Sequence, residues 1–112
     1  MPAGTYNIVI DQGSDFAIQL TLSEEEIPKN LTGYSARAQM RRTKASDTIS
    51  ATFTCEVRDE ANGIIVMSLG NQETVNLDSG LYYYDLEVYT ENDANVTRLI
   101  EGQVTLTQEI TR

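Results

Sequence analysis

The sequence predicts an all-β protein, an immunoglobulin-like β-sandwich of about seven antiparallel strands, in a single domain that spans residues 1–112. Two observations predict this fold. Apolar and polar residues alternate with a period of two in most apolar segments, which is the pattern of half-buried strands. Turn residues separate these segments at intervals of roughly ten residues, and that spacing is typical of sandwiches and barrels.

The first two predicted strands are joined by a short turn. Residues 6–11 form the first strand, with three large side chains on one face: Tyr6, Ile8 and Ile10. Residues 15–22 form the second strand and have the cleanest alternation in the chain. The polar segment 23–30 is predicted to be a loop.

Three more strands are predicted in the middle of the chain. Residues 34–42 and 49–57 both alternate, and the inward face of the latter holds Ile49, Ala51, Phe53, Cys55 and Val57. The Asn62-Gly63 pair predicts a hairpin turn, because such pairs adopt positive φ readily. Residues 64–69 form the fifth strand, but their apolar run does not reveal which face is buried. Residues 71–77 are predicted to form a short helical turn.

The segment that follows combines a tight corner with a regular strand over residues 80–90. The spacing of Asp78, Gly80 and Tyr82 is that of a tyrosine corner, in which a phenol at the start of a late strand bonds to upstream backbone. After the corner, apolar residues take one parity, while Asp85 and Glu87 take the other. This strand is therefore expected to have one dry face and one wet face.

The last predicted strand covers residues 96–110 and is long enough to bend. Gly102 within it predicts a β-bulge or a close approach of another backbone segment. Beyond that glycine, three apolar residues share one face: Val104, Leu106 and Ile110.

Composition limits the classes of partner. The formal net charge is −9, which disfavours nucleic acid and anionic membrane surfaces and suits a basic protein partner. Neither a signal peptide nor a membrane span is indicated, so assembly in a cytoplasm is expected.

No catalytic or metal-binding constellation is found in the sequence. The chain has no histidine and one cysteine, so a catalytic thiol at Cys55 would lack its usual base. The interpretation of Cys55 as a small buried hydrophobe is preferred. We therefore expect a protein that is not an enzyme and that has no cofactor and no metal.

Candidate contact residues lie on the outward faces of two strands or at their ends. They are Arg37, Arg41, Arg42, Tyr83 and Tyr89. The cluster of Arg41, Arg42 and Lys44 is interpreted first as a solvated strand end and second as a docking patch.

Several segments resemble a group of small structural proteins from tailed bacteriophages and prophages: residues 4–16, 30–41, 80–87, 96–104 and 109–112. The patterns that carry the resemblance are Leu-Thr-Gly-Tyr-x-Ala-Arg-x-Gln-x-Arg from Leu31 and Gly-x-Tyr-x-Tyr-Asp-Leu from Gly80. In pattern only, the chain is also similar to the amino-terminal domain of baseplate upper proteins. The resemblance implies a virion structural protein with an immunoglobulin-like sandwich, and it implies no cofactor or catalytic residue.

Three functions follow as hypotheses. The first is a tail or baseplate component, or a fibre adaptor, that docks to other virion proteins. The alternatives are a decoration protein of the capsid and a glycan-binding module. The virion hypotheses imply assembly in the bacterial host cytoplasm, several symmetric copies in the particle and contacts with other virion proteins.

Overall fold

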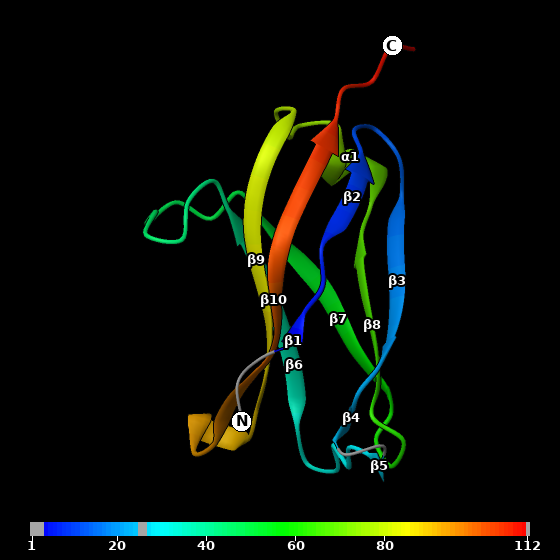
Figure 1. Cartoon of the computed structure of the whole chain (residues 1–112), viewed down its shortest axis with the longest axis vertical. Coiled ribbons are helices and arrows are strands. Elements are labelled where there is room, and N and C mark those ends of the chain that lie inside the picture. Colours follow the sequence, from blue (N-terminus) through cyan, green and yellow to red (C-terminus); the bar gives the residue numbers. More distant parts are fainter. Residues whose placement is uncertain (1–3, 25–26, 112) are drawn as a thin grey trace.

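The computed structural model describes residues 4–24 and 27–111, and strands make up most of it (Figure 1). The all-β prediction is confirmed. The described part contains ten strands: β1 (Gly4–Thr5), β2 (Ile8–Asp11), β3 (Phe16–Thr21), β4 (Ser23–Glu24), β5 (Ile27–Pro28), β6 (Ser35–Arg41), β7 (Ala51–Asp59), β8 (Ile64–Leu69), β9 (Gly80–Tyr89) and β10 (Val96–Thr107). Two short helical segments are present: α1 (Asn71–Thr74) and the 3₁₀ turn η1 (Glu91–Asp93). Within the described residues, no helix has the length and apolar character to cross a membrane.

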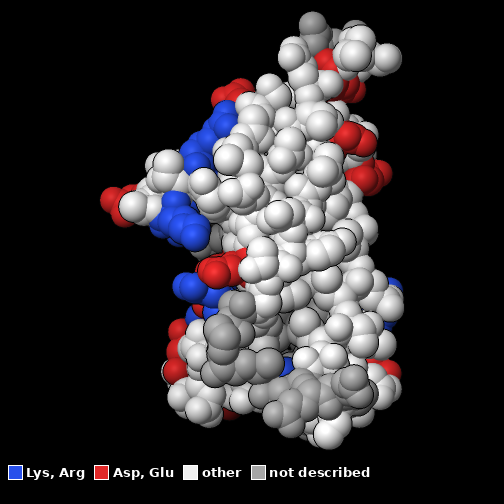
Figure 2. All heavy atoms as spheres, in the orientation of Figure 1, with Lys and Arg blue, Asp and Glu red and all other residues white. Residues whose placement is uncertain are grey.

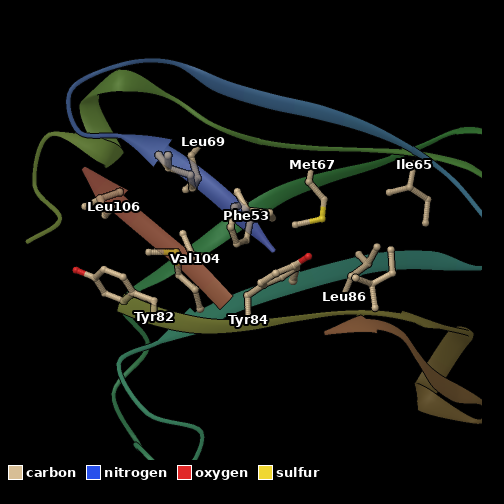
Figure 3. Packing of buried hydrophobic residues seen from close by; sticks show 14 of the residues in the cluster. Phe53, Ile65, Met67, Leu69, Tyr82, Tyr84, Leu86, Val104 and Leu106 are labelled. Atoms are coloured by element: carbon tan, nitrogen blue, oxygen red, sulfur yellow. The ribbon is translucent and has the colours of Figure 1, made fainter. Parts of the chain in front are cut away.

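Eight of the strands form one curled, mixed sheet that folds over on itself at β7, and β4 and β5 form a separate two-stranded sheet. The hydrogen-bonded order is β1-β10-β9-β6-β7-β8-β3, and β2 also pairs with β10. The first part of β7, Ala51 to Phe53, pairs with β6, and the part from Thr54 onward pairs with β8. As a result, the arm of β3 and β8 faces the arm of β9 and β10 across an apolar interior (Figure 3).

Two strand pairs are parallel, which corrects the prediction that all strands run antiparallel. Both β1 and β2 pair with β10 in parallel. Parallel neighbours need no hairpin between them, and these pairs join segments almost a whole chain apart, so local alternation carries no signal for their direction. The immunoglobulin-like form of the sandwich stays a prediction.

All seven predicted strands are present. β8 has its predicted bounds, β7 starts later but runs to Asp59, and the other five are shorter than predicted. The segment 23–30, predicted to be a loop, holds the two-residue strands β4 and β5, and β1 adds another two residues. Ile49, predicted to point inward, is instead exposed, and so are Tyr6 and Ile110, which alternation placed on one face with core residues. Tyr6 is 46% exposed because the chain lies between β1 and β2 there, and its backbone rather than its side chain faces β10. Ile49 precedes β7 and Ile110 follows β10, so both lie outside the ladder.

The core is formed by the alternating residues of both arms (Figure 3). On β8, whose buried face the sequence left open, the buried residues are Ile65, Met67 and Leu69. The ring of Phe53 bridges the interior, with centroids 6.2 Å from Phe16 and 6.1 Å from Tyr84. Aromatic pairs at such distances add to the stabilisation from burial alone.

The start of β9 is held by a tyrosine and an arginine together. Tyr82 is buried and donates its hydroxyl to the carbonyl oxygen of Asp78 at 2.5 Å. The guanidinium of Arg42 lies 4.3 Å from the centre of the Tyr82 ring and donates to the carbonyl oxygens of Ser79 and Leu81 at 3.1 and 3.2 Å. Gly80 has φ +133°, and a Cβ there would meet the Arg42 guanidinium at 2.5 Å. Glycine is therefore needed for this backbone conformation, and it leaves room for the arginine in its present position.

The glycine in β10 marks a close backbone approach, one of its two predicted meanings. A Cβ on Gly102 would run into the carbonyl group of Tyr6. That carbonyl oxygen also accepts the hydroxyl of Tyr84 at 2.5 Å, and the Tyr6 amide donates to the carbonyl oxygen of Glu101 at 3.0 Å. The β-bulge of this strand lies instead between Arg98 and Ile100.

Cys55 should react slowly with alkylating agents. Burial raises the pKa of its thiol from 9.0 to about 11, and the thiolate is the reactive form. At about pH 8.5, we expect iodoacetamide to alkylate the folded chain roughly tenfold more slowly than the chain unfolded in guanidinium. Mass spectrometry of the intact protein measures the two rates. Equal alkylation rates in the two states would contradict the burial of this thiol.

The same thiol should make stability depend on pH. Because the unfolded chain loses the thiol proton at a lower pH than the folded chain does, the free energy of unfolding should fall as the pH rises from about 9 toward 11.

Candidate binding surface

The outward side chains of β6, β9 and β10 line a shallow groove of about 750 Å³. We call it the outer groove. Residues of the three strands stand in rows across its floor, because each register pair places side chains on the same face. One such row is Arg41, Tyr83 and Gln103. Lys44, from the loop between β6 and β7, Thr5, from β1, and Asn7, from the link between β1 and β2, complete its walls.

One half of the outer groove is neutralised by its own ion pairs. Arg37 binds Glu87 at 2.5 Å, and Asp93 lies 3.4 Å from the same guanidinium. Arg98 binds Asp85 at 3.2 Å and Glu101 at 3.3 Å. These side chains are partly exposed, so the pairs fix the positions of the groups more than they stabilise the fold.

The titration of two groups reflects this arrangement. The pKa of Arg37 is raised, first because Glu87 accepts a hydrogen bond from the charged guanidinium. The pKa of Asp85 is raised because desolvation disfavours its carboxylate more than the nearby Arg98 favours it. The neutralised half thus keeps its carboxylates close to arginine partners.

The two outward tyrosines do not form a bare aromatic platform. The guanidinium of Arg37 lies 4.4 Å from the centre of the Tyr89 ring. The ammonium of Lys44 lies 5.7 Å from the centre of the Tyr83 ring. Both distances are in the range of cation–π interactions. A sugar ring stacking on either tyrosine would have to displace these cations from the ring faces that they cover.

The structure brings four of the five candidate contact residues to one face of the molecule. Arg37, Arg41 and Tyr83 line the outer groove, and Tyr89 lies beside Arg37. Arg42 is exposed but lies over the corner at the start of β9.

Sequence reasoning missed the contribution of Arg98 to the groove. With strict alternation counted back from buried Ile100, Arg98 would point inward. The bulge shifts the register by one residue, so that Leu99 packs against the core and Arg98 reaches Asp85. Alternation alone could not have found this residue, since no glycine or proline marks the bulge.

The sheet also has open edges. Among the described strands, β3 pairs only with β8, and β2 pairs only with β10. The sequence of β3, Phe-Ala-Ile-Gln-Leu-Thr, contains no charged residue and no proline. Charges and prolines are the usual devices that keep an edge from pairing with another chain, so β3 is open to strand addition.

Charge is unevenly distributed over the surface (Figure 2). Lys and Arg atoms gather on the flank where the loop between β6 and β7 projects in Figure 1, and acidic atoms predominate on the other flank of this view. Four of the eight basic residues of the chain line the outer groove: Arg37, Arg41, Lys44 and Arg98. An acid-rich protein thus presents its positive charge mainly on one side.

Comparisons with known proteins leave the family of this chain open. No family model matches the sequence, and no curated protein matches it. Among solved structures, the chain is similar to a family 123 glycoside hydrolase from Clostridium perfringens, studied for the hydrolysis of glycolipid glycans. The identity is 11% and the TM-score is 0.43, with 97% of this chain and 24% of the hydrolase chain covered. The chain thus spans about a quarter of that enzyme, and a likeness of this degree carries no argument about function.

Proposed function

We propose that this protein is a bacteriophage virion structural protein, a tail or baseplate component or a fibre adaptor that docks to other virion proteins. The resemblance of segments along most of the chain to phage structural proteins supports the virion context. The observation that carries a docking role is the outer groove, where arginine and tyrosine side chains meet on one face of the sheet. These two residue types are enriched at protein interfaces and dominate their binding energy.

The open edges of the sheet offer a second mode of docking. The unpaired backbone groups along β3 can accept a strand from a neighbouring protein, and its uncharged side chains do not oppose this pairing. Single contacts of this kind are weak, but symmetric copies in a particle multiply them.

The ion pairs of the carboxylates in the outer groove favour a binding function for this groove over a hydrolytic one. Asp85 and Glu87 are both held by arginines, at 3.2 and 2.5 Å. A general acid or nucleophile must be free to reach its substrate, and here each carboxylate would first have to leave its partner.

The test is to find the chain in purified particles. We expect particles that are dissociated and separated into heads and tails to carry this chain in the tail fraction, at a handful of copies per particle as judged by quantitative mass spectrometry. Recovery with the heads at hundreds of copies would indicate the capsid decoration alternative instead, because a shell repeats its sites over its whole surface. Absence from both fractions would contradict any virion role.

A further inference from the structure

The end of the outer groove nearest the start of β9 carries positive charge that the protein itself does not neutralise. We call Arg41, Lys44 and the adjoining Arg42 the basic end. Within the described part of the chain, none of these three side chains forms an ion pair with a carboxylate, whereas Arg37 and Arg98 form two each. This is notable in a chain with 17 acidic and 8 basic residues, where acidic partners are in excess.

The side chains of the basic end are nevertheless held in place. Arg41 donates to the carbonyl oxygen of Ser46 at 2.8 Å and to the side-chain oxygen of Gln39 at 3.1 Å. Lys44 lies over Tyr83. A guanidinium has five N–H donors, so these two bonds orient Arg41 and leave donors for a ligand. Cationic groups that are already positioned lose less entropy on binding an anion.

The nearest carboxylates of the groove are drawn away from the basic end. The row of Gln39, Asp85 and Glu101 lies next to the row of Arg41 and Tyr83. Both carboxylates of that row bind Arg98, which comes from the far side of the row. The positive charge of Arg41 and Lys44 is therefore left for a group from outside the chain.

We propose that the basic end binds an acidic, extended segment of a partner protein. Arg41 and Lys44 pair with its carboxylates, and the ring of Tyr83 packs against its aliphatic stems. The proposal rests on the proposed function in taking the partner to be a protein, and it adds the chemistry of that partner. Charge complementarity gives the choice of ligand, and the groove volume of about 750 Å³ lies within the range of sites that enclose part of a ligand. The net charge of −9 by itself suits a basic partner, so the proposed acidic contact is confined to this local patch of positive charge. A long polyphosphate is disfavoured, because it would extend beyond the patch over like charge.

A fluorescein-labelled peptide of about eight glutamates is the probe, and its binding to the purified chain is followed by fluorescence anisotropy. We expect saturable binding at about 50 mM salt that weakens several-fold at about 300 mM. The double variant Arg41→Gln/Lys44→Gln should bind at least about tenfold more weakly. Arg41→Lys should bind the peptide more tightly than Arg41→Gln does, because lysine keeps the positive charge. It should still bind more weakly than the unchanged chain, because lysine cannot hold a carboxylate with two parallel hydrogen bonds.

Arg58→Gln is the control, because it removes a positive charge from β7 at an exposed pair with Glu56. It should bind the probe as the unchanged chain does, and circular dichroism should show all variants folded. The proposal is overturned if the peptide does not bind, if Arg58→Gln weakens binding as much as the double variant does, or if a labelled thymidine octamer binds equally well at the same residues. If the peptide does not bind but the chain is found with the tails, only this inference is wrong. If the peptide binds but the chain is absent from the particles, only the virion role is wrong.

Discussion

The variant Tyr84→Ala should lose about 4 kcal/mol of unfolding free energy, the cost typical of removing a large aromatic side chain from a core. Tyr84 is 4% exposed, its ring packs edge-on against Phe53, and burial raises the pKa of its phenol. Its hydroxyl also fixes the carbonyl oxygen of Tyr6, so the truncation releases the N-terminal segment from β9. Urea unfolding followed by circular dichroism measures the loss, which would take much of the roughly 5–15 kcal/mol of an ordinary domain.

The matched variant Tyr84→Phe separates the ring from the hydroxyl. It keeps the packing on Phe53 and leaves the Tyr6 carbonyl without this donor, so we expect a loss of about 1–2 kcal/mol. If the alanine and phenylalanine variants unfold at the same urea concentration, the ring does not contribute as the core geometry requires.

The second large effect is expected at Gly102. Gly102→Ala should lower the free energy of unfolding by about 2 kcal/mol, in the range of other overpacked sites. The new methyl group would occupy the position of the Tyr6 carbonyl group, and backbone cannot move aside as the tip of a flexible side chain can. Gly102→Val should be worse, since a β-branched side chain needs more of the same space.

Gly4→Ala is the control for Gly102→Ala, because it adds the same methyl group to the neighbouring strand β1. Among the described residues, its Cβ would meet only the carbonyl oxygen of Leu99, at an ordinary 3.8 Å. We expect no loss and a gain of about 0.4–1 kcal/mol, because alanine has less freedom than glycine in the unfolded chain; the same urea titration measures it. A Gly102→Ala variant as stable as Gly4→Ala would show that the Tyr6 segment does not lie against β10.

Local alternation predicted the strands well because the period of two is a property of a strand alone. It placed Tyr82, Tyr84, Leu86 and Val88 inside, as the structure has them. It failed at Tyr6, where a neighbouring strand approaches so closely that backbone takes the place of a side chain. It failed again at Ile49 and Ile110, because apolar residues continue the pattern beyond the last ladder hydrogen bond.

The candidate site depended on contacts that no local pattern encodes. Arg42 and Tyr82 are 40 positions apart in sequence, and only the pairing of β6 with β9 brings the cation onto the ring. Parity predicted correctly that Arg37, Arg41, Tyr83 and Tyr89 point outward. It could not indicate that Arg37 is neutralised and Arg41 is not, because this depends on the pairing of Arg37 with Glu87 and on the bulge that brings Arg98 to Asp85.

The parallel pairing of β2 with β10 has a consequence for mechanical load. The two strands run in the same direction, and both arrows point toward the upper end of the molecule in Figure 1. Tension that pulls the start of β2 downward and the end of β10 upward would drag one strand lengthwise past the other. The hydrogen bonds between Ile8–Asp11 and Val104–Thr107 would then be loaded together in shear rather than broken one after another.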